Sequence, residues 1–275
     1  GLVREIFLKQ NIEDNSPDLY NAVHRMKRIT VILQMLVDKI SILETMTPLD
    51  FLDFRDFLRP ASGFQSIQFK ILEAVLGLPF DQRFGQQYYL SQLNEGDVQK
   101  VKQAEKEISL FSLVNEWLKR MPFITDASYW TDPDDFFQQY RMVYEASLQE
   151  GEKQNMQAFD EFFMKADESS PRRLHTQSNR AALFIMLYRD YPLLQAPFQF
   201  INTLLDVDEL LAQWRYRHMN MVQRMIGRRI GTGGSTGAHY LKNAADTHYI
   251  FKEFADLTSF LIQRHHLPAL PTALR

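Results

Sequence analysis

Apolar side chains along this chain repeat at the spacing of α-helices. The clearest repeat lies within residues 17–43, where apolar positions follow one another at steps of three and four, which places them on one helix face. Ile29, Leu36 and Leu43 widen that face, which favours a core helix of a bundle, with a coiled-coil partner as the alternative. The repeat consists of Leu19, Val23, Met26, Thr30, Leu33, Val37 and Ile40.

Helical spacing continues through most of the remaining sequence, and the period-two alternation of half-buried strands is absent. Ser16-Pro17 and Thr47-Pro48-Leu49-Asp50 have the residue order of helix starts, the second as a capping box. The pattern predicts an all-α fold, a helical bundle in one domain over 1–275, with a polar, solvated helical excursion at about 139–172. Other helices are expected at 97–118, 179–188, 198–205 continuing into the stretch from 210, and 244–265.

The stretch from Leu210 to Gly237, LLAQWRYRHMNMVQRMIGRRIGTGGSTG, organises the prediction. Its first part is an amphipathic helix, and Gly227 is expected to end it in the left-handed conformation that suits the position after a helix. One face is expected to carry Leu211, Trp214, His218, Met221 and Met225, and the other largely Arg215, Arg217, Gln223 and Arg224.

His218 lies in the middle of this apolar stripe, which leaves two interpretations. It is either a core histidine bonded to a neighbour or an axial ligand of haem iron, which a neutral imidazole on an apolar, Met-lined face suits. The glycine-rich run after it is either a flexible connector or a backbone nest that, with Thr232 and Ser235, holds a small anion or zwitterion.

Arg55 is a second unusual residue, because it shares a helix face with Phe51 and Leu58. Its side chain either reaches out to solvent or forms a structural ion pair. Alternatively, it is a buried guanidinium that awaits a carboxylate, which its planar fork binds bidentately.

Composition narrows the function classes. The 275 residues carry a formal net charge of −3 and no cysteine, which excludes disulfides, thiolate metal sites and a cysteine nucleophile. There is no global positive field for nucleic acid. Phosphate-loop, dinucleotide, zinc-protease and serine-hydrolase motifs are absent, and no carboxylates are spaced as an obvious acid–base pair.

Two long segments resemble the tryptophan 2,3-dioxygenase family. They are WRYRHMNMVQRMIGRRIGTGGSTGAHYL, from Trp214 to Leu241, and ILETMTPLDFLDFRDFLRPASGFQS, from Ile42 to Ser66. PFQFINTLLDVDELL and the opening VREIF resemble it more weakly. The resemblance implies a helical bundle around a haem b pocket. It also implies an oxidoreductase that inserts O2 across the indole C2–C3 bond of L-tryptophan to give N-formylkynurenine, the first step of tryptophan catabolism by the kynurenine route.

The resemblance also implies roles for single residues. His218 matches the haem iron axial ligand, with Trp214 supporting it, and Arg55 matches the arginine that pairs with the substrate carboxylate. Lys70 stands where relatives often have an arginine, which puts a haem propionate contact there in doubt. The remaining substrate-binding positions are Thr232 of the glycine-rich loop, Phe51 and Leu58 lining the indole pocket, and Ser62 and Gly63 near haem and substrate.

The opening GLVREIFLKQ lacks an initiator Met and begins with residues typical of a helix already under way. We therefore expect an N-terminal segment to be missing and to be present as a separate chain or fragment. In the family that segment carries the distal histidine, so no catalytic residue is expected in this chain. The resemblance further implies a cytoplasmic homotetramer, with no nucleic-acid or membrane partner. A non-catalytic haem protein and an all-α interaction scaffold are the alternative functions.

Overall fold

The computed structural model describes most of the chain, and the regular structure of the described residues is helical throughout. This confirms the all-α fold class expected from the sequence. None of the described helices combines the length and apolar composition needed to cross a membrane. The described residues are 3–4, 7, 17–58, 66–83, 90–121, 135–165, 172–227, 229–231 and 237–271.

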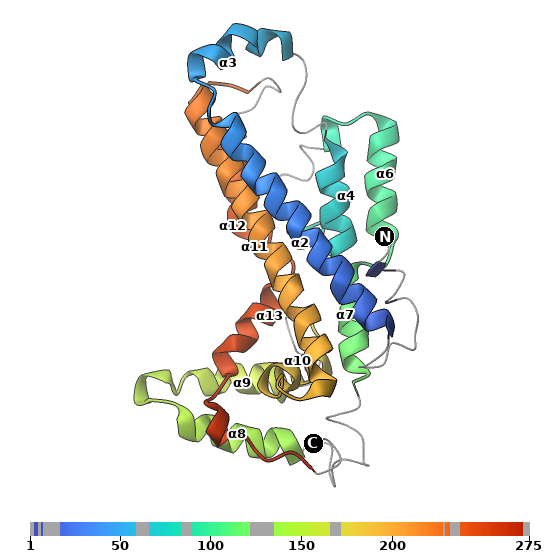
Figure 1. The fold of residues 1–275 in the computed structure, drawn as a ribbon, viewed down its shortest axis with the longest axis vertical. Coiled ribbons are helices and arrows are strands. Elements are labelled where there is room, and N and C mark those ends of the chain that lie inside the picture. Colours follow the sequence, from blue (N-terminus) through green and yellow to red (C-terminus); the bar gives the residue numbers. More distant parts are fainter. Residues whose placement is uncertain are drawn as a thin grey trace. The chain divides into compact units, whose positions relative to one another are not determined.

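The chain divides into two compact units, each assembled from separate stretches of sequence. Two long helices, α2 (Pro17–Leu43) and α11 (Pro192–Ile226), contribute residues to both (Figure 1). The single domain expected over 1–275 stays a prediction. Unit 1 comprises Gly1–Arg25, Leu113–Leu205 and Phe251–Arg275, and unit 2 comprises Met26–Ser112 and Asp206–Ile250.

Unit 2 contains the described residues of the two long sequence motifs. In it α4 packs against α6, and Arg217 of α11 ties that helix to the end of α2 by bonding Ser41 and Glu44. Besides its parts of α2 and α11, it contains α3 (Pro48–Arg55), the 3-10 helix η1 (Asp56–Leu58), α4 (Ile67–Leu76), α6 (Glu95–Lys106), the start of α7 (Leu110–Lys119) and α12 (Gly237–Thr247).

The apolar repeat of α2 is buried as expected. Its six apolar members are at most 7% exposed, and Thr30 is half-buried. Leu36 and Leu43 are nevertheless exposed, at 37% and 48%, so the wider buried face was wrong for these two positions. The other helices cover only the narrow stripe made by steps of three and four, and side chains beside that stripe remain in solvent.

The start of α3 confirms the capping box. The Thr47 hydroxyl accepts the backbone N–H of Asp50 at 3.2 Å, and the Asp50 carboxylate accepts the backbone N–H of Thr47 at 3.0 Å. These bonds satisfy backbone donors that a helix start otherwise leaves free. The Thr47 hydroxyl also donates to the Asp50 carboxylate at 2.7 Å. This bond and the one from the Thr47 backbone N–H lower the pKa of the Asp50 carboxyl, because they stabilise its charged form.

The single helix expected over 97–118 is two helices, α6 and α7. The break has a local cause, since the Ser109 hydroxyl accepts the backbone N–H of Ser112 and so begins a new helix. Ile108, expected on the apolar face, is 54% exposed at this break. Gly77 follows α4 with a φ of 114°, and a Cβ there would lie 2.7 Å from Cβ of Phe111. Only glycine therefore permits this approach of α7 to the end of α4.

The prediction of one long helix over 244–265 is also wrong. α12 ends at Thr247, and the backbone then bonds to α11 instead of continuing as a helix. The Asp208 carboxylate accepts the backbone N–H of Ile250 at 2.9 Å, and Arg215 donates to the His248 carbonyl at 3.0 Å. The chain continues in unit 1 as α13 (Lys252–Asp256) and the 3-10 helices η6 (Leu257–Phe260) and η7 (Arg264–His266).

Unit 1 has an aromatic core. Hydroxyl groups within it are satisfied by backbone carbonyls: Tyr140 donates to Phe260 at 2.6 Å and Tyr144 to Ser259 at 3.0 Å. Burial raises the pKa of both phenols. Besides its part of α11 and the C-terminal helices, the unit contains most of α7, α8 (Asp135–Ser147), the 3-10 helix η4 (Glu150–Glu152), α9 (Asn155–Phe163) and α10 (Thr176–Leu187).

The polar excursion expected near 139–172 contributes to this core. Phe159 and Phe163 of α9 are fully buried, and Phe162 is 8% exposed, so the stretch is not simply solvated. These phenylalanines are spaced by three and four residues, but the many charged residues around them made the stretch look polar in the sequence. Two of those charged residues, Arg141 and Asp160, pair with each other at 2.7 Å. The polar composition of this stretch thus describes only its outer face.

Candidate functional site

The described residues of the two long motifs all belong to unit 2. On α11 the His218 imidazole stacks on the Trp214 indole, with ring centroids 4.9 Å apart and an angle of 18° between planes. His218 is half-buried, and burial lowers its pKa, so the ring is neutral near pH 7. Its Nδ1 is buried and has no hydrogen-bond partner among the described residues. A neutral imidazole with an uncommitted nitrogen has the chemistry of a metal ligand.

Arg215, next to Trp214, corrects the sequence interpretation. It was expected on the polar face of the helix, yet it is only 5% exposed. Its guanidinium donates to the Glu73 carboxylate at 3.1 Å and to the His248 carbonyl at 3.0 Å. These partners come from α4 and from the segment after α12. The periodicity of α11 alone therefore gave no sign that this arginine is buried.

Glu73 is the centre of a buried charged cluster that the sequence analysis missed. Its Oε1 lies 3.0 Å from His248 Nδ1, and its Oε2 faces the Lys70 ammonium at 3.5 Å. Burial by itself would raise the pKa of this carboxyl, but the His248 hydrogen bond and the charges of Lys70, His248 and Arg215 outweigh burial and lower it to about 2. The available signal was a lone acid in the apolar sequence ILEAVLGL.

The cluster also occupies Lys70, the residue considered for a propionate contact. Lys70 is 8% exposed, and its ammonium is engaged with Glu73 inside unit 2. Lys70 therefore contributes a positive charge to this cluster, which helps to lower the pKa of the Glu73 carboxyl.

Arg55 is buried at the end of α3, with 7% of its surface exposed. Its Nη2 donates to the backbone carbonyl of Ile230, immediately before Gly231 and the glycine-rich run. No carboxylate of the described residues pairs with it. A side chain that reaches out to solvent and a structural ion pair both fail to describe this environment. A buried guanidinium whose protein partner is a neutral carbonyl retains donors and charge for an anion.

Of the other predicted binding positions, the structure describes Phe51 and Leu58. Phe51 is half-buried and meets Phe54 edge-on at 5.4 Å, whereas Leu58 lies in η1 and is 42% exposed. No hydrogen bond or ring contact joins Arg55 to His218. Thr232, Ser62 and Gly63 lie outside the described residues.

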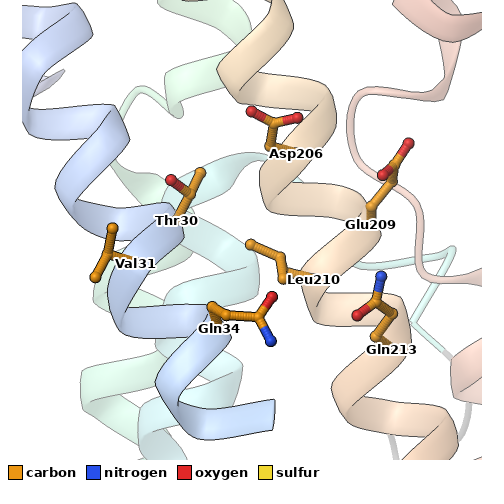
Figure 2. Close-up of a pocket in the computed structure, with 7 residues that line it drawn as sticks. All are labelled: Thr30, Val31, Gln34, Asp206, Glu209, Leu210 and Gln213. Carbon is orange, nitrogen blue, oxygen red and sulfur yellow. The ribbon is translucent and has the colours of Figure 1, made fainter. Parts of the chain in front are cut away.

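A separate open cleft of about 360 Å³ lies between α2 and α11 in unit 2 (Figure 2). Two carboxylates on α11 give it an acidic wall, and burial raises the pKa of one of them, Asp206. Gln34 and Leu210 point toward one another across it. Neither Arg55 nor His218 lines the cleft, and its acidic wall opposes an anionic ligand. It is lined by Thr30, Val31, Gln34, Asp206, Glu209, Leu210 and Gln213.

Comparison with known proteins agrees with the two motifs. The family model described as tryptophan 2,3-dioxygenase matches residues 2–261. A tryptophan 2,3-dioxygenase of Dictyostelium discoideum is 39% identical over 291 residues, which cover 94% of this chain and 72% of the relative. Another, of Alteromonas mediterranea, is 38% identical and covers 99% of this chain and 81% of the relative. A third, of Bdellovibrio bacteriovorus, is 37% identical, with coverage of 99% and 82%. A match over nearly the whole length, at these identities, means that the chain belongs to the tryptophan 2,3-dioxygenase family.

Proposed function

We propose that this protein inserts both atoms of O2 across the C2–C3 bond of the indole of L-tryptophan and releases N-formylkynurenine. This reaction opens tryptophan catabolism by the kynurenine route. Membership of the family and the names of its relatives support the reaction. The observation that carries the assignment to this site is Arg55, a buried guanidinium that has no carboxylate partner among the described residues.

The amino-acid end of the substrate is the natural partner of that guanidinium. An α-carboxylate provides two oxygens for the planar fork of Arg55 and neutralises its charge in a site with little water. The Ile230 carbonyl holds Arg55 beside the start of the glycine-rich loop, where Thr232 is the proposed second contact to the amino-acid end. Phe51 and Leu58 are the proposed walls of the indole pocket, with Ser62 and Gly63 near substrate and cofactor.

Haem b is the proposed cofactor, and His218 is the residue that would ligate its iron. The residues fit this role, because the imidazole is neutral, lies on the helix face that also carries Met225, and stacks on Trp214. Bound haem iron supplies the activation of oxygen. This chain supplies ligation, orientation of the indole and exclusion of water. No proton transfer by a side chain of this chain is part of the proposal.

The carboxylate role is tested by steady-state kinetics on two substrates. Arg55→Leu lowers kcat/KM for L-tryptophan roughly 10- to 100-fold, because it removes a charge-assisted contact of about 1.5–3 kcal/mol. Arg55→Lys is also impaired, since an ammonium forms no fork. Tryptamine lacks the carboxylate, so wild type and Arg55→Leu should turn it over equally poorly. An equal loss on both substrates would refute the carboxylate role.

The ligand role is tested by His218→Ala. This variant is expected to lose haem while keeping its helix content, which absorption and circular dichroism measure. Full haem loading with an unchanged axial-ligand spectrum would exclude His218. A homotetramer in the cytoplasm completes the proposal, and light scattering and cell fractionation test these two points.

A further inference from the structure

A row of stacked rings leads from α4 to the proposed haem ligand. The Phe69 ring stacks on the Trp214 indole, with centroids 4.8 Å apart and an angle of 25° between planes. Trp214 in turn stacks on His218 at 4.9 Å and 18°. The indole therefore has aromatic contacts with both a neighbouring helix and the imidazole. Offset contacts of this kind favour a narrow range of ring orientations.

The same two helices are locked by the buried charges. Glu73 follows Phe69 by one turn of α4, and it bonds Arg215, the residue after Trp214 on α11, at 3.1 Å. The Arg215 guanidinium also lies 5.6 Å from the centre of the Phe69 ring. A buried, bonded ion pair resists sliding of one helix along the other. This ion pair therefore keeps Phe69 of α4 beside Trp214 of α11.

Within the part of the chain that the structure describes, no hydrogen bond to Nδ1 fixes the plane of the His218 ring. Metal-bound histidines usually donate their second ring nitrogen to a carboxylate or carbonyl, which sets the orientation of the ring. The Nδ1 of His218 is buried and unbonded among the described residues. We infer that Phe69 is a positioning residue, which fixes the plane of the His218 imidazole by holding Trp214 against it. The inference rests on the proposed ligand role of His218.

The test compares variants of the haem-loaded full chain that keep bulk but lose the ring. Phe69→Leu and Phe69→Met are expected to release haem to excess apomyoglobin about 10- to 100-fold faster, the range typical for partners that orient a ligand. They should also shift the iron–histidine stretching band in the resonance Raman spectrum of the ferrous protein. Phe69→Tyr keeps the ring, so its rate of haem release and its Raman band are expected to stay near the wild-type values.

Phe111→Leu is the matched control. Phe111 is a buried phenylalanine of the same unit, outside the ring stack, so its variant reports general loosening. It should leave the Raman band in place. If it shifts the band as Phe69→Leu does, or if both Phe69 variants keep wild-type release and band position, the inference is wrong.

A double-mutant cycle separates positioning from general packing. If Phe69 acts through Trp214, then Phe69→Leu adds nothing to Trp214→Leu, and the double variant releases haem no faster than the single one. Additive effects would overturn the inference. His218→Ala separates a failure of the proposed ligand role from a failure of the role of Phe69. If this variant retains haem with an unchanged iron–histidine band, His218 is not the ligand. If His218→Ala loses haem while Phe69→Leu keeps the wild-type haem release and Raman band, only the role of Phe69 is wrong.

Discussion

Replacing Glu73 by glutamine is expected to cost unit 2 several kcal/mol of stability. The side chain is 2% exposed, and its oxygens lie 3.1 Å from Arg215, 3.0 Å from His248 and 3.5 Å from Lys70. Glutamine keeps the shape but removes the negative charge that faces the buried Arg215 and Lys70. Removing one partner of a buried ion pair costs about 3–5 kcal/mol, because the remaining charge stays desolvated.

The pKa of Glu73 gives a second route to the magnitude. It falls from the ordinary 4.5 to about 2, because bonds and positive charges outweigh the opposing effect of burial. At about 1.4 kcal/mol per pH unit this corresponds to about 3 kcal/mol near neutral pH. Since the pKa is depressed in the folded state, the stabilisation is present above about pH 4.5 and is lost as the pH falls toward 2.

Urea denaturation followed by tryptophan fluorescence measures this cost. At pH 7 the midpoint of Glu73→Gln should fall well below that of wild type, and the gap should narrow steadily as the pH is lowered from 5 to 3. Glu150→Gln is the control, because Glu150 pairs with Lys153 on the surface with 87% of its side chain exposed. A Glu73→Gln midpoint equal to that of the control at pH 7, or a gap unchanged at pH 3, would refute the reasoning.

Two further predictions concern glycine and the helix cap. Gly77→Ala should lower the stability of the protein by about 2–4 kcal/mol, because φ is 114° and a Cβ would lie 2.7 Å from Phe111. Gly227→Ala should cost only about 1 kcal/mol, because its φ is 56° and a Cβ there would meet no other atom within 4 Å. Equal urea midpoints for the two variants would show that the space around the added Cβ is irrelevant. Thr47→Ala should raise the pKa of the Asp50 carboxyl toward its ordinary value, because the Thr47 hydroxyl supplies the larger of the two hydrogen bonds that lower it. An unchanged carbon-13 NMR titration of Asp50 would contradict this.

Features that depend on local sequence were predictable. The buried stripe of α2, the capping box at Thr47 and the end of α11 at Gly227 each follow from residues within one or two turns. Spacing and side-chain chemistry determine such features before any tertiary contact forms. The same holds for the neutral, half-buried His218 on α11.

Features set by distant residues were not predictable. Arg215 is buried because Glu73, 142 positions earlier, reaches it from another helix, and α12 stops where Asp208 captures the N–H of Ile250. No periodicity within a helix reports which of its polar residues will meet a partner inside the fold. The environment of Arg55 likewise depends on Ile230, which is 175 positions away.

The bond from Arg55 to a neutral carbonyl has a consequence for how the protein should be handled. A guanidinium held by a carboxylate would exchange one ion pair for another on binding substrate, whereas Arg55 has no carboxylate partner to give up among the residues that the structure describes. A small carboxylate in the medium can also accept from the guanidinium donors that the Ile230 carbonyl does not engage. Under the proposed function, acetate or formate buffers should act as competitive inhibitors toward tryptophan, while the same concentration of a bulky sulfonate buffer should not. Apparent affinities measured in different laboratories would then differ with the buffer rather than with the enzyme.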